Sequence, residues 1–457
     1  MITAKAFAGK RYAVYGLARS GLATVRALLA SGAEVTGWDA KLAPFSQREE
    51  GLGERAHPTS EPSDAEQPHP ALSLLGEGLK IAKLDTADLS QFDSLVVTPG
   101  LPLNCHPIAQ RARAAGVEII GDIELFARAR PELPLHKLVG ITGTNGKSTT
   151  TALVHHILKT AGVPATMGGN IGLPILAQDS LPEGGVYVLE LSSYQIDLTQ
   201  SLDCDVAVLL NITPDHLDRY DSFNQYRNSK RRLFLMQSDE HLALLSARNR
   251  ESEDISYELE HEFGRLQNIE MFDGGTIRDQ SRWPTLQGPH NAENVAAAAK
   301  VCRALGVLEE VIEAGLVTYP GLPHRMERIR EKDGVLFVND SKATNPTATA
   351  PALAAFEKIR WICGGQPKTD TLDECAPHFG HVRTAYTIGE AADLFERLLA
   401  MRIPVKNCGK LDVAVREAAA DAEVGDTVLL SPACASFDQF RDFEDRGDQF
   451  RATVGAL

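Results

Sequence analysis

The chain has 457 residues, 43% of them apolar and 23% charged, which is the composition of a globular protein with room for about three domains. A formal charge of −15 argues against a nucleic-acid or anionic-membrane partner, although a local basic pocket for phosphates is compatible with it. Seven cysteines without a Cys-x-x-Cys pair argue against a disulfide framework or zinc site, and no apolar run of about 18 residues occurs, so we expect a cytoplasmic protein without a membrane span.

The first predicted domain, 1–121, opens with a strand, a turn that contains Gly16, Ala18 and Gly21, and a second strand that ends at Asp39. This is a Rossmann-like βαβ opening in which Ala18 stands where a second glycine is expected. A methyl group there crowds the approach of a pyrophosphate. We therefore expect a site for another nucleotide, with a nicotinamide cofactor as the alternative.

A polar excursion interrupts this domain at 44–72, where Pro, Glu, Ser and Gln are frequent. The alternation resumes with a buried-type strand at 94–98, a helix at 108–115 and a strand at 118–120. We place the boundary to the second domain after Gly121.

The second predicted domain, 122–321, is organised around a turn between a strand at 138–141 and a long helix. The turn reads Gly143, Thr144, Asn145, Gly146, Lys147, Ser148 and Thr149. Its glycines let successive backbone N–H groups point inward, and the helix adds its positive N-terminal end, so the turn forms an anion cradle. Lys147 can reach the terminal phosphates of a nucleotide, and the Ser148 hydroxyl can ligate its Mg²⁺. Ile141 replaces the first glycine of the usual P-loop pattern.

Polar side chains at the ends of two further strands complete the predicted magnesium site. An apolar strand at 186–191 carries Glu190, and a strand at 205–211 leads to His216. Because ligand groups gather at the carboxyl ends of strands in doubly wound sheets, these side chains are expected near the phosphate loop. Mg²⁺ prefers the oxygen ligands that Ser148 and Glu190 supply. Glu190 as a paired structural acid and His216 as a hydrogen-bonded loop histidine are the alternatives.

A helix from Ser222 to Leu235 follows, and Ser222 with Gln225 looks like a capping box. It carries Lys230, followed by two arginines, which by itself is typical of a solvated helix face.

The third predicted domain, 322–457, follows an Ala-rich helix at 291–305 that Gly306 stops. Strands are expected at 335–338, 360–363, 384–388 and 427–430, with helices between them. The chain is therefore predicted to be α/β in three domains: a Rossmann-like N-terminal domain, a central P-loop-type ATPase domain and a Rossmann-like C-terminal domain.

Several blocks of the sequence resemble the Mur ligases, over a stretch from about Val14 to Phe450. The blocks are Gly143–Thr149, Leu189–Gln195, Asn211–Tyr220, Tyr226–Lys230, Gly321–Arg325, Asn339–Asn345 and Ser431–Phe440. The last two favour the branch of the family that acts on D-glutamate. The resemblance implies an ATP-dependent ligase of peptidoglycan precursor synthesis, which joins D-glutamate to UDP-N-acetylmuramoyl-L-alanine through an acyl phosphate. It also implies a monomer without nucleic-acid or membrane partners.

The resemblance implies roles for individual residues around ATP. The ATP-binding positions are Gly143, Thr144, Asn145, Gly146, Lys147, Ser148, Thr149, Asn294, Arg325, Asp340 and Lys342. Two Mg²⁺ ions are implied, held by Ser148, Glu190, His216 and Lys230. Lys230 matches a lysine that CO₂ converts to a carbamate, because a protonated ammonium cannot ligate a metal. Lys147, Glu190, His216 and Lys230 are thus the predicted catalytic residues.

The implied substrate-binding positions are Arg19, Ser20, Asn170, His324, Thr344, Lys368, Ser436 and Phe443. Arg19 and Ser20 match the uridine-diphosphate site, and Lys368 is a natural partner for the side-chain carboxylate of D-glutamate. Two structural alternatives remain. Phe437, Phe440 and Phe443 recur every three residues as a core stripe does, and Ser436 could be only a helix cap.

Three rival functions remain open at this point. A sister ligase, such as a folylpolyglutamate synthetase, would need a different C-terminal pocket. A P-loop ATPase or GTPase switch would hydrolyse nucleotide without an amino acid. A nicotinamide-dependent oxidoreductase would use the segment from Gly16 to Asp39.

Overall fold

The computed structural model describes residues 1–39, 78–215, 219–262 and 268–457, so the polar excursion predicted at 44–72 lies outside them. The chain forms two compact units, one of residues 1–273 with 297–312 and one of 274–296 with 313–457. The described residues of these units form three sheets, of five, six and six strands, connected through helices. The predicted α/β class is therefore confirmed, whereas the domain boundaries at 121 and 321 remain a prediction.

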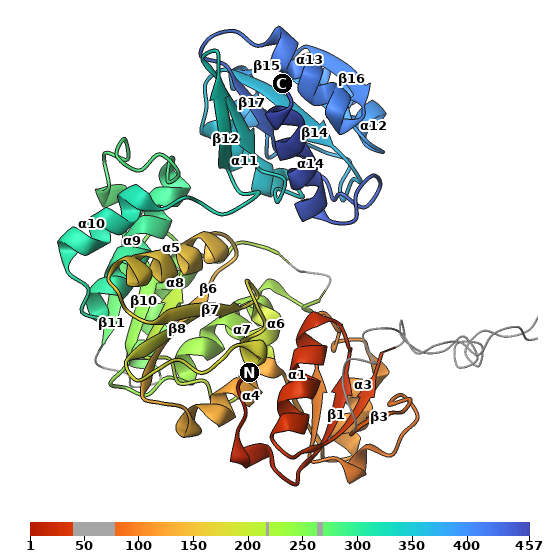
Figure 1. Cartoon of the computed structure of the whole chain (residues 1–457), viewed down its shortest axis with the longest axis vertical. Coiled ribbons are helices and arrows are strands. Elements are labelled where there is room, and N and C mark those ends of the chain that lie inside the picture. The colour runs from red at the N-terminus through yellow and green to blue at the C-terminus, as the bar shows by residue number, and fades with distance from the viewer. Residues whose placement is uncertain (40–77, 216–218, 263–267) are drawn as a thin grey trace, which may run out of the picture. The chain divides into compact units, whose positions relative to one another are not determined.

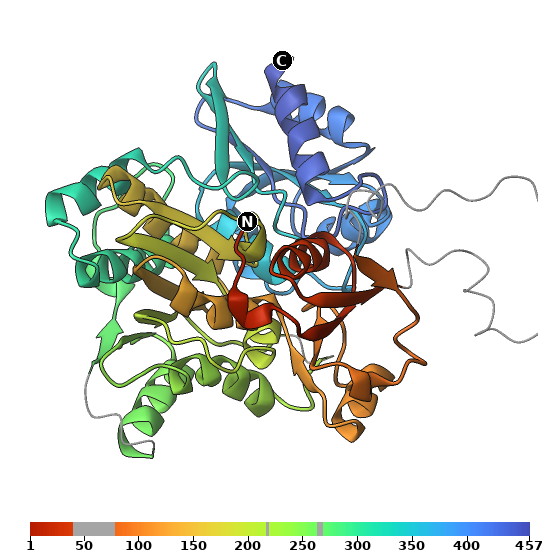
Figure 2. The ribbon, with the colours of Figure 1, turned by 60° about the horizontal axis from the view of Figure 1, so that its bottom comes forward.

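The first sheet is parallel, with the order β3-β2-β1-β4-β5 (Figure 1). Its strands are β1 (Arg11–Tyr15), β2 (Glu34–Trp38), β3 (Leu79–Ile81), β4 (Ser94–Val97) and β5 (Glu118–Ile120), with helices α1 (Arg19–Ala30), α3 (Pro107–Ala114) and α4 (Asp122–Ala129). Helix α1 lies against β1 and β2 (Figure 2). A Cβ at Gly21 would lie 1.8 Å from the Gly16 carbonyl oxygen. Only glycine therefore fits at this position in the first turn of α1, which passes close to the end of β1.

The second sheet is also parallel, with the order β11-β10-β9-β6-β8-β7. Its strands are β6 (His136–Thr142), β7 (Ala165–Gly169), β8 (Gly185–Glu190), β9 (Val206–Leu209), β10 (Leu242–Ser246) and β11 (Ile269–Phe272). The helices that follow are α5 (Lys147–Thr160), α6 (Ser193–Asp197), α7 (Phe223–Leu235), α8 (Arg250–His261), α9 (Pro289–Ala304) and α10 (Glu309–Thr318). Because β6, β8 and β9 are adjacent and parallel, their carboxyl ends bring Thr142, Glu190 and Leu209 to one edge of the sheet.

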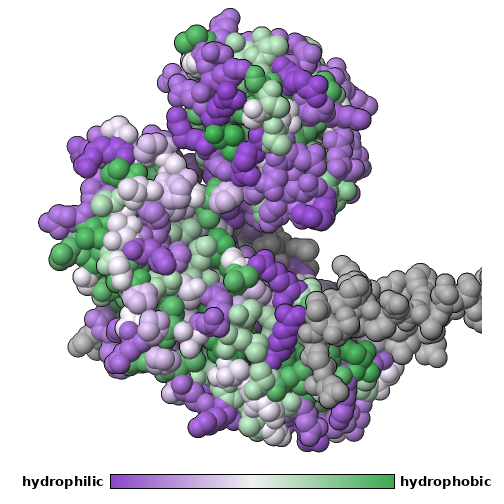
Figure 3. Space-filling model, viewed as in Figure 1, coloured by the Kyte–Doolittle hydropathy of each residue, from purple (hydrophilic) through white to green (hydrophobic). Residues whose placement is uncertain are grey.

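The third sheet has the order β12-β13-β17-β14-β15-β16, in which only the β12–β13 pair is antiparallel among the described strands. Its strands are β12 (Glu327–Lys332), β13 (Val335–Asn339), β14 (Ile359–Gly364), β15 (Val382–Ile388), β16 (Val405–Gly409) and β17 (Thr427–Leu430), with helices α11 (Pro346–Ala354), α12 (Ala392–Leu399), α13 (Leu411–Asp421) and α14 (Phe443–Gly455). Separate apolar cores contain Trp361 and Ile362, neighbours on β14, which shows that the sheet is covered on both faces. The face of this third-sheet region that is seen in Figure 3, at the top of the view, is mostly hydrophilic.

The capping box predicted at Ser222 is only half formed. The Ser222 hydroxyl accepts the N–H of Gln225, as expected. The Gln225 side chain, however, accepts the N–H of Asp221, at 3.0 Å, and not that of Ser222. In the described part of the chain, no helix is long and apolar enough to cross a membrane.

We expect Gly169→Ala to lower the thermal unfolding temperature more than Gly162→Ala does. Both glycines have positive φ, 86° and 72°, where a side chain costs about 1–2 kcal/mol. Only at Gly169 would the new Cβ meet backbone, 2.1 Å from the Glu190 carbonyl oxygen, whereas Gly162 has open space. The clash should cost about 1–3 kcal/mol more. Circular dichroism melting of both variants tests this, and equal melting temperatures would contradict it.

Candidate active site

The phosphate loop runs from the end of β6 to the start of α5, as predicted. Gly143 and Gly146 have φ values of 154° and 86°. A Cβ at Gly143 would lie 3.0 Å from that of Leu210, so the close approach of the neighbouring strand end also favours glycine. The side chain of Asn211 accepts the Asn145 N–H at 2.8 Å and donates to the Asn145 carbonyl at 3.1 Å. Asn211 therefore fixes the loop, a role that was not predicted for it.

Two lysine side chains meet at one carbonyl oxygen of this loop. Lys147 Nζ donates to the Gly143 and Thr144 carbonyls, both at 2.8 Å, and Lys230 Nζ donates to the Gly143 carbonyl at 2.9 Å. Lys230 is only 1% exposed, so the solvated-face alternative is wrong for it. Burial lowers the pKa of the Lys230 ammonium well below its usual value of 10.5; the charge of Lys147 acts in the same direction, and nearby aspartates oppose it.

Glu190 ends β8 beside this loop and is 2% exposed. Its Oε1 accepts a hydrogen bond from the Asn170 amide at 2.9 Å, while its Oε2 is buried and accepts none from the described residues. A buried carboxylate oxygen that accepts no hydrogen bond lowers the stability of the fold unless a cation lies beside it. Ser148, also buried, is the second residue of α5. These oxygens fit Mg²⁺.

Not every predicted ligand can be placed. His216 lies outside the described residues. In the described part of the chain, His, Cys, Asp and Glu side chains form no group of three or more that could hold a metal ion. The side chain of Asn170, which was predicted to contact substrate, donates a hydrogen bond to the Glu190 carboxylate.

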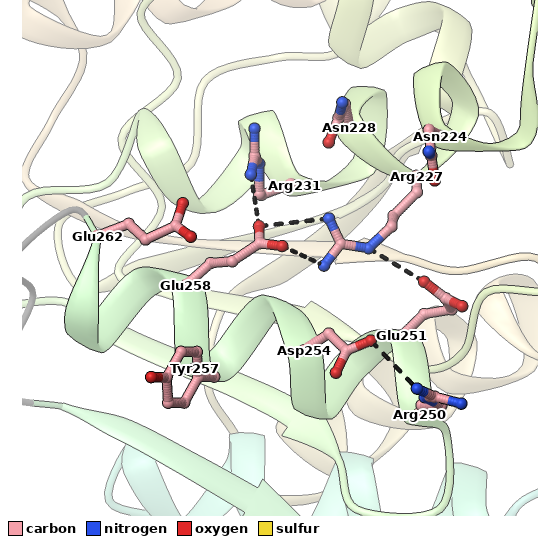
Figure 4. Close-up of a pocket in the computed structure, with 10 residues that line it drawn as sticks. All are labelled: Asn224, Arg227, Asn228, Arg231, Arg250, Glu251, Asp254, Tyr257, Glu258 and Glu262. Atoms are coloured by element: carbon pink, nitrogen blue, oxygen red, sulfur yellow. Dashed lines mark hydrogen bonds and ion pairs between the residues drawn. The ribbon is translucent and has the colours of Figure 1, made fainter.

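Helix α7, which carries Lys230, is attached to α8 by ion pairs (Figure 4). Arg227 pairs with Glu258 at 2.6 Å and with Glu251 at 3.0 Å, and Arg231 also pairs with Glu258. These residues line a groove of about 610 Å³ whose described lining residues include none of the predicted site positions. The ion pairs fix the orientation of the helix that presents Lys230 to the phosphate loop.

The start of α1 places Arg19 and Ser20 at the carboxyl end of β1, with Arg19 exposed. Asp39 accepts the Leu17 N–H at 2.8 Å, so this acid stabilises the turn at the end of the first strand. Sequence reasoning missed Arg219, which donates to the Gly100 carbonyl at 3.0 Å and to the Leu101 carbonyl at 2.9 Å, in the loop after β4.

The second unit contains the remaining predicted ATP-binding residues. Asn294 donates to Asn291 at 3.1 Å, on one face of α9 as expected. Asp340 is buried and accepts from the Ser431 hydroxyl at 2.7 Å and the Met326 N–H at 3.1 Å. Burial raises the pKa of Asp340 to about 7, although these hydrogen bonds and the charge of Arg325 act against it.

The predicted D-glutamate residues surround the carboxyl end of the third sheet. Lys368 Nζ lies 3.3 Å from the Thr344 hydroxyl, and the Lys342 ammonium lies 3.7 Å from the centre of the Phe443 ring. Ser436 is buried. Asp442 caps α14, so the helix-cap alternative for Ser436 is wrong for that helix.

The structure also decides the core-stripe interpretation and describes the surroundings of His324. Phe437 is 69% exposed, so the core-stripe interpretation of the three phenylalanines is wrong. His324 is buried and has positive φ, 62°, with its ring nitrogen 3.0 Å from the Asn339 amide.

Comparison with known proteins shows the family of the chain. Residues 141–302 match the Mur ligase middle domain, and residues 324–434 match the glutamate ligase domain of Mur ligases. A relative from Novosphingobium aromaticivorans is 56% identical, with 100% of this chain and 97% of the relative covered. Another, from Sphingopyxis alaskensis, is 54% identical, with both chains covered in full. Both relatives are named UDP-N-acetylmuramoylalanine–D-glutamate ligase.

Solved structures show a similar fold at low identity. UDP-N-acetylmuramate–alanine ligase MurC from Thermotoga maritima has a TM-score of 0.57 at 16% identity, covering 98% of this chain and 99% of its own. MurF ligase from the same organism, solved with ADP, has a TM-score of 0.57 at 17% identity, covering 98% and 96%. These two likenesses concern the fold alone. With both Mur ligase domains matched and relatives more than half identical over the whole chain, the protein belongs to the Mur ligase family, beside the UDP-N-acetylmuramoylalanine–D-glutamate ligases.

Proposed function

We propose that this protein is an ATP-dependent ligase that adds D-glutamate to UDP-N-acetylmuramoyl-L-alanine during peptidoglycan precursor synthesis. The observation that carries the proposal is 56% identity over the full chain to a ligase of that name. The phosphate loop supports it independently. The Lys147 ammonium lies at the loop carbonyls, and the start of α5 adds its positive end, so an anionic nucleotide is favoured there.

The proposed reaction has two chemical steps. The L-alanine carboxylate attacks the γ-phosphorus of ATP, forming an acyl phosphate and releasing ADP. The amine of D-glutamate then attacks the acyl carbon; the amide bond forms, the amine loses its proton, and phosphate leaves with the electrons of the broken C–O bond. Both steps bring anionic groups together, so positioning and positive charge supply most of the catalysis. Lys147, on the loop itself, is the residue that would hold the transferred phosphate.

Mg²⁺ would be held by Ser148, Glu190, His216 and Lys230, and we propose two ions, as the resemblance implies. When bound, Mg²⁺ neutralises phosphate charge and orients the phosphates for attack. The buried Oε2 of Glu190, which accepts no hydrogen bond from the described residues, supports a cation at this place.

Lys230 would contribute to that site as a carbamate. A neutral amine can attack CO₂ with its lone pair, forming an N–C bond and losing a proton, whereas an ammonium has no lone pair with which to attack. Burial of Lys230 and the charge of Lys147 both favour the neutral amine. The carbamate would place negative charge beside Lys147 and relieve the repulsion between the two lysines.

The other assignments follow the same proposal. Arg19 and Ser20 would bind the uridine diphosphate, with Asn170 and His324 as further substrate contacts. Asn294, Arg325, Asp340 and Lys342 would bind ATP, and Thr344, Lys368, Ser436 and Phe443 would bind D-glutamate. Each sheet would form the core of one domain, with boundaries at 121 and 321, and the enzyme would act as a monomer. The exposed ammonium of Lys368 beside Thr344 supports the assignment of a carboxylate partner there.

Phosphate release with ATP, Mg²⁺ and UDP-N-acetylmuramoyl-L-alanine should require D-glutamate, and mass spectrometry should find a product heavier by one glutamyl residue. Lys147→Ala should lower kcat by about 10²- to 10³-fold, because it removes a group that binds the transferred phosphate. Lys159→Ala, at the exposed end of the same helix, serves as the control and should leave kcat unchanged.

Three outcomes of that assay would contradict the proposal. Release with L-glutamate only would move the enzyme to another specificity. Release without either amino acid would favour a nucleotide switch. Equal activity of Lys147→Ala and Lys159→Ala would remove the proposed role of the loop lysine.

Lys230→Met should be more stable relative to the wild type at neutral pH than at alkaline pH, in CO₂-free buffer. The folded-state pKa of Lys230 lies below the usual 10.5, so protonation favours the unfolded chain. This cost is absent above pH 10.5, grows as pH falls below it, at up to about 1.4 kcal/mol per pH unit, and is absent from the Met variant.

Urea unfolding at a series of pH values from neutral to 10.5 measures that difference. Lys159→Met, which removes an exposed lysine of α5, is the matched control and should show a difference from wild type that stays constant with pH. A constant difference for Lys230→Met as well would show that Lys230 is protonated equally readily in both states.

A further inference from the structure

Arg446 lies in the first turns of α14 and is completely buried. Its Nε donates to the Ser341 hydroxyl at 2.9 Å, and its Nη2 donates to the Ser341 carbonyl at 2.8 Å and the Cys434 carbonyl at 3.1 Å. Its Nη1 donates to the Ala435 carbonyl at 3.2 Å. None of these acceptors is a carboxylate. A buried cation held by neutral groups is costly, so the hydrogen bonds that it makes must be well formed.

The acceptors of Arg446 belong to the loops that carry the proposed D-glutamate residues. Ser341 lies three residues before Thr344, and Cys434 and Ala435 directly precede Ser436. Helix α14 itself begins with Phe443.

The loop that carries Lys368 is joined to the same group. The backbone of Ala435 exchanges two hydrogen bonds with that of Gln366, both at 2.9 Å, and Gln366 lies two residues before Lys368. One guanidinium therefore connects the segments that present Thr344, Ser436 and Lys368.

The surroundings of the guanidinium leave it little freedom to move. A Cβ at Gly365 would lie 3.1 Å from Arg446 Nη1 and 2.3 Å from the Ala435 carbonyl oxygen. The Ser341 hydroxyl, which accepts from Arg446, donates to the Phe443 carbonyl at 2.9 Å. Ala433 has positive φ, 58°, and its N–H donates to the Ala343 carbonyl at 3.0 Å. Such a strained backbone persists only where its surroundings hold it.

We propose that Arg446 is a positioning residue for the amino-acid substrate, setting the spacing of Ser436, Lys368 and Thr344 through the carbonyls that it binds. The inference rests on the proposed function. The planar guanidinium can bind acceptors on two loops at once, in a fixed geometry that an ammonium cannot reproduce. Burial lowers the pKa of Arg446 to about 10, so it remains protonated at neutral pH and adds positive potential near a site for a dicarboxylate.

The test compares Arg446→Lys with Arg360→Lys in the full-length protein. Arg360 is a matched control because it is also mostly buried. It lies near the start of β14 and pairs with Asp426 at 2.8 Å, at the end of the strand away from Gln366 and Lys368. In Arg446→Lys the KM for D-glutamate should rise by about 10- to 100-fold, because displacements of about 1 Å at a binding site have effects of that size. The KM for ATP should change little.

A purely structural role predicts a different pattern. Arg360→Lys should lower the unfolding temperature to a similar extent while leaving the KM for D-glutamate unchanged. Equal KM shifts in the two variants, or no shift in Arg446→Lys, would overturn the inference. If Arg446→Lys does not fold, Ser341→Ala is the second variant. It removes the hydroxyl that accepts from Arg446 and donates to the Phe443 carbonyl, and it should still raise the KM for D-glutamate several-fold by the same reasoning; an unchanged KM there would also overturn the inference.

The wild-type enzyme separates this inference from the proposed function. Phosphate release that does not depend on D-glutamate would contradict the proposed function itself. Release that depends on D-glutamate, together with an unchanged KM in Arg446→Lys, would contradict only the role of Arg446.

Discussion

The site depends on the carbonyl oxygen of Gly143, which accepts hydrogen bonds from both Lys147 and Lys230. Two ammonium groups so close repel each other, and one of them is removed from water. The arrangement is therefore stable only if an anion approaches or one lysine loses its charge. Binding of a triphosphate and reaction of Lys230 with CO₂ would each satisfy this requirement. The backbone geometry of this one loop is therefore connected both to the proposed nucleotide binding and to the proposed carbamylation of Lys230.

Most buried strands could be predicted from the sequence because they are apolar runs with clear ends. The runs at 94–98, 138–141 and 186–191 correspond to β4, β6 and β8. Several strands at the edges of the sheets were not predicted, although the edge strand β5 was. β12, Glu-Arg-Ile-Arg-Glu-Lys, and β16, Val-Lys-Asn-Cys-Gly, carry polar side chains because an edge strand is partly exposed to water. Their pairing is decided by the neighbouring strand, which no local pattern reveals.

The candidate site was likewise predictable only in part. Lys147, Ser148 and Glu190 were predictable because each adjoins the end of an apolar strand, where parallel sheets collect ligands. The contact between Asn170 and Glu190, and the four hydrogen bonds of Arg446, join residues far apart in sequence. In sequence Arg446 is only an arginine in a charged helix. The same limit applies to Lys230, whose neighbours suggest a solvated face although the side chain is buried.

The most direct test of this account is ¹³C NMR of the protein in ¹³C-labelled bicarbonate. We expect a carbamate carbon resonance in the wild type, its loss in Lys230→Met, and its retention in Lys159→Met, because burial lowers the pKa of Lys230, beside Gly143, and so favours its neutral amine, whereas Lys159 is exposed. Absence of that resonance from a preparation that forms the glutamyl product, or its persistence in Lys230→Met, would contradict the account.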